Sequence, residues 1–189
     1  AGSKTILDLR STATELAPYI YLDGANVKYF NNGSVVIAGT TNLVAGTWYH
    51  IALCRDGSNT RLFVNGTQDG TTYSDGSNYG STKPIRIGGN YAGSSVFPGY
   101  IDELRVSTNS RYTANFTAPS GIHQGDATTV LLAHFDGTYG QQYTDDWSGV
   151  ATWNNGDDFC NDAIRETQRQ AGAPAGYNGK THRYADAAR

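Results

Sequence analysis

The sequence predicts an all-β protein, folded as an antiparallel β-sandwich or jelly roll, and three observations lead to this fold class. Short apolar runs are separated by turn signals about every 8 to 12 residues, which is the spacing typical of sandwich strands. The chain of 189 residues contains 23 Gly and 13 Tyr but no Met, a composition typical of turn-rich β proteins. Side chains in residues 48–55 alternate as a strand requires.

The strand at residues 48–55 is the one around which we place the others. Its two mostly apolar faces are formed by Tyr49, Ile51 and Leu53 on one side and by Trp48, His50, Ala52 and Cys54 on the other. Because such a strand is covered on both sides, we expect it in the centre of one sheet, with Cys54 as a small core residue. Residues 61–65 are expected to pair with it through a hairpin loop of about five residues, and Asn65-Gly66 closes the second strand with a dipeptide that adopts positive φ easily.

The other predicted strands follow in chain order. Residues 4–10, 19–23, 27–30 and 35–37 form the early strands, and residues 85–88 and 100–106 the late ones. The apolar period slips at Asp102 and Glu103, which indicates a β-bulge in the last strand. Two irregular loops, at residues 69–82 and 89–95, are rich in small polar residues and tyrosine, and loops of this kind are often functional. Residues 115–119 are expected to run back across the sandwich.

After residue 121 the pattern changes. Residues 128–135 predict one more strand, and Asp157-Asp158 is placed to cap a short helix over residues 159–170. We therefore divide the chain into a sandwich at residues 1–120 and, at residues 121–189, a strand followed by one short helix and an extended linker or docking arm.

Four ordered motifs resemble the laminin-G-like, concanavalin A-type jelly roll. They are TWYHIA at residues 47–52, FVNG at 63–66, IRIGG at 85–89 and GYIDELRV at 99–106, and the resemblance covers roughly residues 3–120. It implies that the family's usual first strands precede Ala1, so that part of a sheet is missing. Residues 110–117 and 131–137 are similar to the variant of this domain in virion proteins of tailed bacteriophages, especially marine ones.

The phage resemblance implies a non-enzymatic structural protein, such as a fibre, tail appendage or capsid-surface component. Its expected location is the virion, or otherwise the extracellular space. Its expected partners are other virion proteins and copies of itself in an oligomer, with host attachment as a further role. The alternative is a carbohydrate-binding module that recognises cell-surface polysaccharide.

The sequence predicts no catalytic site. A glucanase on this fold needs two glutamates on one strand, with carboxyl groups about 5 Å apart, and none of Glu15, Glu103 and Glu166 shares a strand with another. No pair of histidines or cysteines has the spacing of zinc ligands, so we predict no cofactor. Calcium stays open, because jelly rolls of the resembled family sometimes hold it at the rim. Its candidate ligands here are Asp69, Asp75 and Asp102, residue types that are equally common in turns and bulges.

Binding is the remaining function, and its predicted residues lie on the two irregular loops. Tyrosine rings can stack on sugars, and Asn or Asp can bind hydroxyl groups, although the same composition also suits a protein contact surface. The candidate glycan- or partner-binding residues are Tyr73, Asp75, Asn78, Tyr79, Asn90 and Tyr91. The net charge of -3 argues against nucleic acid as a partner, and no long apolar run predicts insertion into a membrane.

Overall fold

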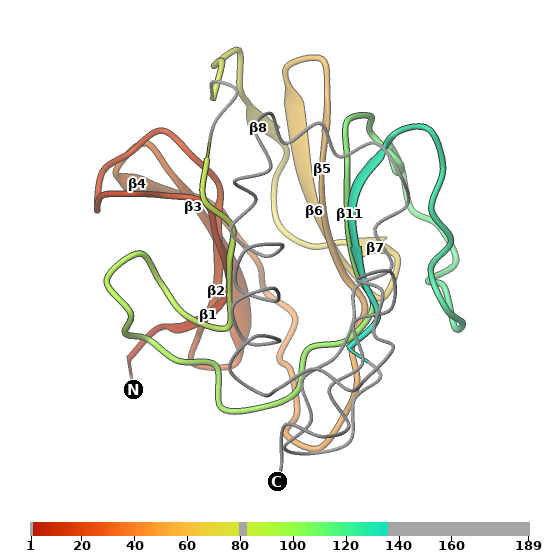
Figure 1. The fold of residues 1–189 in the computed structure, drawn as a ribbon, viewed down its shortest axis with the longest axis horizontal. Helices are drawn as coiled ribbons and strands as arrows, with labels where there is room; N and C mark the ends of the chain where they lie inside the picture. Colours follow the sequence, from red (N-terminus) through yellow and green to blue (C-terminus); the bar gives the residue numbers. More distant parts are fainter. Residues whose placement is uncertain (1, 80–82, 136–189) are drawn as a thin grey trace, which may run out of the picture. The chain divides into compact units, whose positions relative to one another are not determined.

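The computed structural model describes residues 2–79 and 83–135, and within them the protein is all-β, with antiparallel strand pairing and no helix (Figure 1). The strands are β1 (Lys4–Asp8), β2 (Tyr19–Asp23), β3 (Asn26–Asn31), β4 (Ser34–Ala38), β5 (Ile51–Asp56), β6 (Asn59–Val64), β7 (Thr67–Gln68), β8 (Tyr73–Ser74), β9 (Arg86–Ile87), β10 (Leu104–Ser107) and β11 (Thr129–Ala133). The predicted all-β sandwich is confirmed. The predicted helix at residues 159–170 lies outside the described residues.

The first sheet has the strand order β4-β3-β2-β1-β9. Its central hairpins are closed by two-residue turns that use positive φ. Gly24 (φ 61°) follows the end of β2, and Asn32 and Gly33 (φ 47° and 80°) join β3 to β4. These are the primed turns that match the twist of antiparallel strands. Local turn chemistry therefore sets the register of three consecutive strands.

The second sheet contains β5, β6 and β7, and β8 also pairs with β6. The prediction that residues 48–55 form the central strand was wrong in two respects. Among the described residues β6 lies between its neighbours, while β5 pairs with β6 alone. In addition β5 begins at Ile51, so Trp48 precedes the strand and is 65% exposed. Periodicity shows that side chains alternate, but it cannot show which strand has two neighbours.

The hairpin between β5 and β6 is tighter than predicted. Asp56 pairs with Asn59, which leaves only Gly57 and Ser58 in the turn, with Gly57 at φ 57°. Asn65 and Gly66, at φ 49° and 79°, close β6 onto β7 as the sequence predicts. The expected loop of about five residues was wrong because the strands extend into the polar residues beside the turn.

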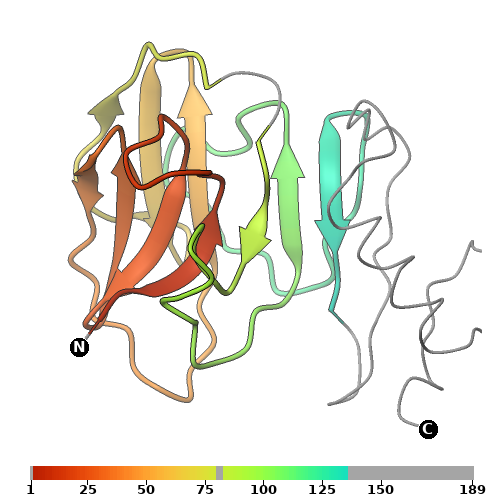
Figure 2. The same cartoon turned by 60° about the vertical axis from the view of Figure 1, so that its left-hand side comes forward.

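The two sheets face each other (Figures 1 and 2), and an apolar core lies between them. Buried side chains from the first sheet meet buried side chains from the second in a cluster of Ile20, Val27, Tyr29, Ile37, Leu62 and Val64. Burial of each such side chain contributes about 1.5–3 kcal/mol to the free energy of unfolding. Cys54, predicted as a core residue, is half-buried.

The segment at residues 109–116 lies against the turn between β6 and β7. Phe116 N donates to Gly66 O over 2.9 Å, and Gln68 N donates to Asn115 Oδ1 over 2.9 Å. The rings of Tyr112 and Phe116 stack with centroids 3.5 Å apart, and both meet Phe63 edge-on. These contacts hold residues 115 and 116 at the turn, and the expected return of residues 115–119 across the sandwich stays a prediction.

Of the described residues, 101–108 and 121–135 belong to a second compact unit. In its described part β10 pairs antiparallel with β11, which confirms the predicted strand near residues 128–135. The bulge was predicted at Asp102 and Glu103, but the register of β10 shifts between Val106 and Ser107. Glu103 precedes β10 and has a φ of 52°. The predicted division at residue 120 stays a prediction.

Candidate binding site

The first predicted loop folds around the carboxylate of Asp75, which is buried. Asp75 Oδ1 accepts a hydrogen bond of 2.9 Å from Ser77 N, and Asp75 Oδ2 accepts one from the Tyr79 hydroxyl. Arg55, on β5, places Nη1 3.8 Å from Asp75 Oδ2 and donates to Ser77 O over 2.6 Å. Asp75 therefore holds the loop together from inside and does not face a ligand at the surface.

The Tyr79 hydroxyl also lies in a buried network. It is 2.9 Å from the Tyr29 hydroxyl and accepts a hydrogen bond of 3.1 Å from Asn31 Nδ2. Burial, and next the negative charge of Asp75, raise the pKa of Tyr29 well above its usual value. Tyr73 is half-buried, with its ring edge-on to Tyr29 at 6.4 Å. The polar ends of this loop thus stabilise the interior of the sandwich.

The second predicted loop is organised by the amide of Asn90. Its Oδ1 accepts hydrogen bonds from Ala92 N at 3.1 Å and from Ser94 N at 2.9 Å, and its Nδ2 donates to Ser95 Oγ at 3.2 Å. Such a side chain closes a turn onto its own backbone. Asn90 is therefore engaged within the loop.

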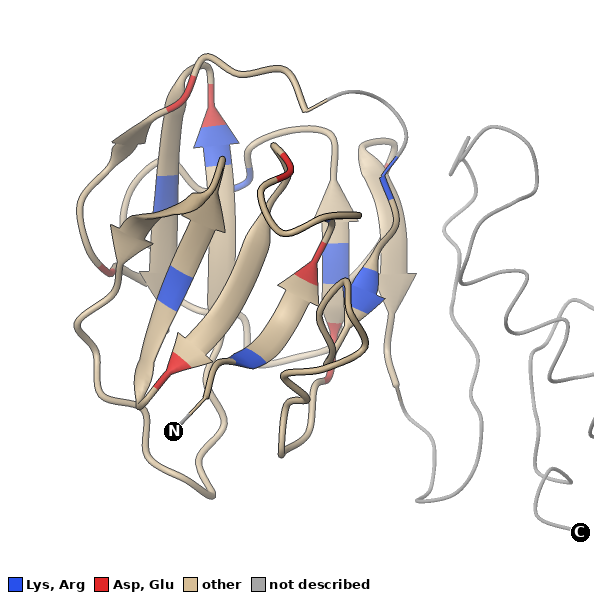
Figure 3. Cartoon of the chain, turned by 90° about the vertical axis from the view of Figure 1, so that its left-hand side faces the viewer, with Lys and Arg blue, Asp and Glu red and all other residues tan. Residues whose placement is uncertain are grey.

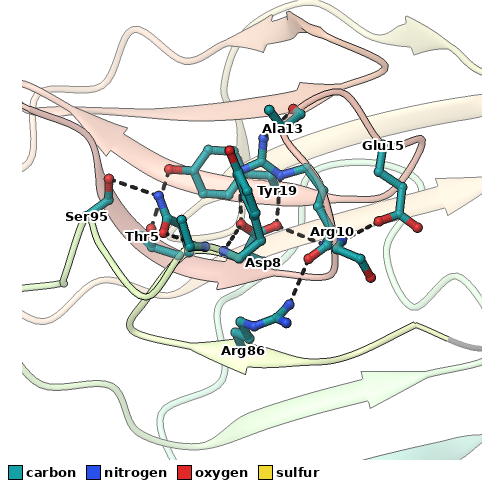
Figure 4. Close-up of polar contacts among 12 residues, drawn as sticks. Thr5, Asp8, Arg10, Ala13, Glu15, Tyr19, Arg86 and Ser95 are labelled. Carbon is teal, nitrogen blue, oxygen red and sulfur yellow. Dashed lines mark hydrogen bonds and ion pairs between the residues drawn. The ribbon is translucent and has the colours of Figure 1, made fainter.

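Tyr91 ties this loop to β1. Its backbone N donates to Asp8 Oδ2 over 2.9 Å, and its ring centroid lies 5.2 Å from the guanidinium carbon of Arg10. Asp8 and Arg10 form the buried ion pair shown in Figure 4, with two hydrogen bonds of 2.9 Å from Nε and Nη2. The guanidinium also lies 3.8 Å above the ring of Tyr19.

This buried pair was not predicted from the sequence, which placed Arg10 at the end of a strand. Arg86 Nη1, on β9, donates to Arg10 O over 2.7 Å, so the cluster links β1, β2 and β9 (Figure 4). The only sequence signal is an Asp and an Arg two positions apart, which is common on exposed strands. A buried Asp-Arg pair with two parallel hydrogen bonds is a strong orienting contact.

The structure therefore separates the six predicted residues by their contacts. Three of them, Tyr73, Asp75 and Tyr79, belong to the network that contacts β3 and Arg55. Two others, Asn90 and Tyr91, form contacts within their own loop and with β1. Asn78 is exposed. The binding role of the six residues stays a prediction, and the contacts above give five of them a structural task as well.

The three calcium candidates lie in three different settings. Asp69 is buried, and its Oδ1 accepts hydrogen bonds from Thr40 N at 2.8 Å and Thr41 N at 3.1 Å. Asp75 is engaged as described above. Asp102 belongs to the second unit, where its Oδ1 accepts from Glu103 N at 2.9 Å. Within residues 2–79 and 83–135 no three His, Cys, Asp or Glu side chains are grouped so that they could hold a metal ion.

Both described glutamates are paired. Glu15 pairs with Lys83, and this hydrogen bond, followed by one from Ser11 N, lowers the pKa of Glu15 from about 4.5 to about 2. In the second unit, Glu103 Oε1 is 2.9 Å from His134 Nδ1, and Oε2 accepts from His123 N at 2.6 Å. Glu166 lies outside the described residues. Each described glutamate thus has its own structural partner.

Apolar side chains at the surface complete the set of candidate contacts. In the part of the chain that the structure describes, the large exposed ones are Val35, Val44, Trp48, Val96, Tyr100 and Ile122. Two are aromatic, and Tyr100 is the more exposed at 82%. The sequence placed Trp48 on a covered strand, so its exposure is a finding of the structure.

Two facing antiparallel sheets, primed hairpins and loops that carry tyrosine and asparagine define a protein of the lectin-like β-sandwich class. The chain belongs to the concanavalin A-like lectin/glucanase superfamily, whose laminin-G-type family description matches residues 3–115. Comparisons with curated proteins and with solved structures returned no match. No helix in the described part of the chain is long and apolar enough to cross a membrane.

Proposed function

We propose that this chain is a non-enzymatic structural protein of a virion, such as a phage fibre, tail appendage or capsid-surface component. Its lectin-like sandwich makes contacts with other virion proteins and with copies of itself. The observation that carries the non-enzymatic part is the pairing of Glu15 with Lys83 and of Glu103 with His134. A retaining glycosidase needs two carboxyl groups that face one scissile bond about 5 Å apart, and each of these two glutamates is instead engaged by its own partner.

The virion part of the proposal rests on the sequence resemblance of residues 110–117. This motif has a packing role in the fold, because Tyr112 and Phe116 stack on each other and both meet Phe63 of β6 edge-on. Aromatic stacking of this kind contributes about 0.5–1.5 kcal/mol per pair beyond the buried area. A motif that secures the fold suits a structural component.

The test is to image native particles that carry this chain and to identify its neighbours. We expect symmetric copies whose sheet edges touch other protein chains. In parallel, the purified chain is incubated with β-glucans and the release of reducing ends is measured. Hydrolysis that is lost in Glu103→Gln, or absence of the chain from purified particles, would contradict the proposal.

A second candidate function is recognition of cell-surface polysaccharide, which would also serve host attachment. Membership of a lectin-containing superfamily and the exposed rings of Trp48 and Tyr100 favour it, because sugars stack on accessible aromatic faces. Tyr91→Ala tests the predicted loop, and Trp48→Ala tests the exposed ring. Polysaccharide retention on a column should fall for at least one of them, while unchanged retention by both would exclude these rings as the binding site.

A further inference from the structure

The edge of the first sheet formed by β4 is unusual in its lack of charge. Residues 29–54 contain no Asp, Glu, Lys or Arg, although charged residues make up 16% of the chain. This stretch includes all of β4 and the connection from β4 to β5. In Figure 3 this edge and the chain that follows it carry neither blue nor red.

The uncharged edge continues beyond β4 along its neighbour β3. Gly39 N donates to Val27 O, and Leu43 N donates to Ala25 O, both over 2.9 Å. Residues 34–43 thus run beside β3 from the Asn32-Gly33 turn to the opposite end of the strand. Two charges from outside residues 29–54 contact this segment. The buried carboxylate of Asp69 accepts hydrogen bonds from Thr40 N at 2.8 Å and Thr41 N at 3.1 Å, and Lys28 Nζ donates to Gly39 O over 3.3 Å.

Natural proteins protect a sheet edge with lysine, proline or a bulge. This edge has one such device, an extra residue opposite the Tyr29/Phe30 step, where the register shifts. Because Asn31 and Ser34 pair across a two-residue turn, Val35 directs its N–H and C=O away from β3. The bulge makes continuous strand pairing along the whole edge unfavourable, so side chains have to supply most of any contact.

Exposed apolar side chains mark the two ends of this edge. Val35 lies at the end near the turn and is 46% exposed, and Val44 lies just beyond the other end and is 63% exposed. Trp48 lies on the same connection as Val44. A hydrogen bond of 3.0 Å from Val44 N to the Tyr49 hydroxyl holds this connection in place. The edge therefore has one small and one large apolar end, separated by neutral backbone.

We propose that this edge is the interface between two copies of the chain related by a two-fold axis. In such an interface residue i of one copy meets residue j of the other, and j meets i. An antiparallel arrangement places Val35 of one copy against the partner copy's Val44 and Trp48, so that both apolar ends are covered. Like charges brought together by a two-fold axis would oppose the contact, and the stretch has none.

This inference deepens the proposed structural role and rests on it, since it names the chain itself as one partner. The alternatives for the same surface are a different protein or a polysaccharide stacked on Trp48. A second copy is favoured because its own two apolar ends match, with exposed Val35 of one copy against exposed Val44 of the other. Tryptophan is also among the residues that dominate protein interface energies.

The test is the mass of the full chain in solution, measured by sedimentation at concentrations from about 1 to 200 μM, the range in which weak dimers form. We expect a concentration-dependent dimer. Val35→Lys and Val44→Glu should each weaken it at least tenfold, because each buries an unpaired charge. The control Val96→Lys changes a similarly exposed residue outside the stretch and should leave the dimer intact.

The double variant distinguishes this arrangement from other dimers. In the proposed geometry the lysine introduced at position 35 of one copy faces the glutamate introduced at position 44 of the other. Val35→Lys together with Val44→Glu should therefore recover most of the lost affinity. A wild-type chain that stays monomeric, or a dimer unaffected by both single changes, would overturn the inference. If the chain is a monomer but is found in particles, the dimer interface is wrong and the virion role stands. If the chain is a dimer but is absent from particles, the virion role is wrong and the dimer interface stands.

Discussion

Arg10 is almost fully buried although it is charged, and its contacts explain how the fold accommodates it. Asp8 neutralises the guanidinium through two hydrogen bonds, and Tyr19 covers its face. Asp8 also accepts hydrogen bonds from the backbone N atoms of Arg10 and Tyr91. A single carboxylate thereby fixes the end of β1 and the loop after β9.

Replacing this carboxylate should be costly. We expect Asp8→Asn to lower the free energy of unfolding by about 3 kcal/mol, because it leaves the Arg10 charge buried without its counterion. Urea denaturation of both proteins measures the difference. Asp23→Asn, a change at an exposed carboxylate on the adjacent strand β2, is the control and should cost less than about 0.5 kcal/mol. Equal losses in both variants would refute this role of Asp8.

Glu15 should make stability depend on pH in the acid range. Its pKa in the folded protein is lowered from about 4.5 to about 2, mainly by the hydrogen bond from Lys83. The unfolded chain therefore takes up the proton first, and the stabilising contribution, complete above pH 4.5, is lost as the pH falls towards 2. Urea midpoints measured through this range should fall less steeply for Glu15→Gln than for the wild type. Parallel curves for the two proteins would argue against the ion pair.

At the scale of the elements, the turn between β6 and β7 is constrained by the chain packed on it. A Cβ atom at Gly66 would lie 2.0 Å from Phe116 O, whereas one at Gly46 would meet nothing within 4 Å. Both glycines have nearly the same φ, +79° and +77°, so the backbone strain of an alanine is similar at the two sites.

The pair of alanine variants therefore isolates the contact with residues 109–116. Gly66→Ala should destabilise the protein by at least about 2 kcal/mol more than Gly46→Ala, because Phe116 has to move away from the turn. Thermal unfolding of both variants, converted to free energies with the wild-type enthalpy, gives the comparison. Similar losses would mean that the segment at 109–116 adapts without cost.

Elements whose turns have a local signal could be predicted from the sequence, and those that depend on distant partners could not. Asn32-Gly33 and Asn65-Gly66 mark their hairpins because the required positive φ is a property of those residues. The pairing of β9 with β1, by contrast, joins Leu7 to Ile87, and no local pattern encodes it. The start of β5 was placed too early because the alternation continues to Trp48, ahead of the first strand residue.

The candidate site shows the same division at a finer level. Tyrosine and asparagine in irregular loops could be recognised from composition, but the burial of Asp75 and of the Tyr79 hydroxyl could not. Both depend on Arg55, Tyr29 and Asn31, which are remote in sequence. The exposure of Trp48 and the uncharged edge needed the sheet order, which only the folded chain reveals.

At the scale of the whole molecule, the proposed interface predicts how association responds to salt. Ion pairs weaken as the Debye length falls, whereas apolar contacts between uncharged surfaces do not. We expect the dissociation constant of the dimer to change less than about threefold between about 50 mM and 500 mM NaCl, as measured by sedimentation. A dimer that dissociates steadily with added salt would indicate an interface elsewhere, on a charged face.

The strand order also has a kinetic consequence. Strands β2, β3 and β4 form a meander joined by two-residue turns, so their contacts are local and should form early. The β1–β9 ladder has to close a loop from residue 7 to residue 87, with a larger loss of chain entropy. The Gly88 amide, which donates to Ile6 O, should thus gain protection later than the β3 amides in pulsed hydrogen exchange. Until β9 docks, a newly synthesised chain exposes the edge of β1, and that interval is when strand exchange between nascent chains competes with correct folding.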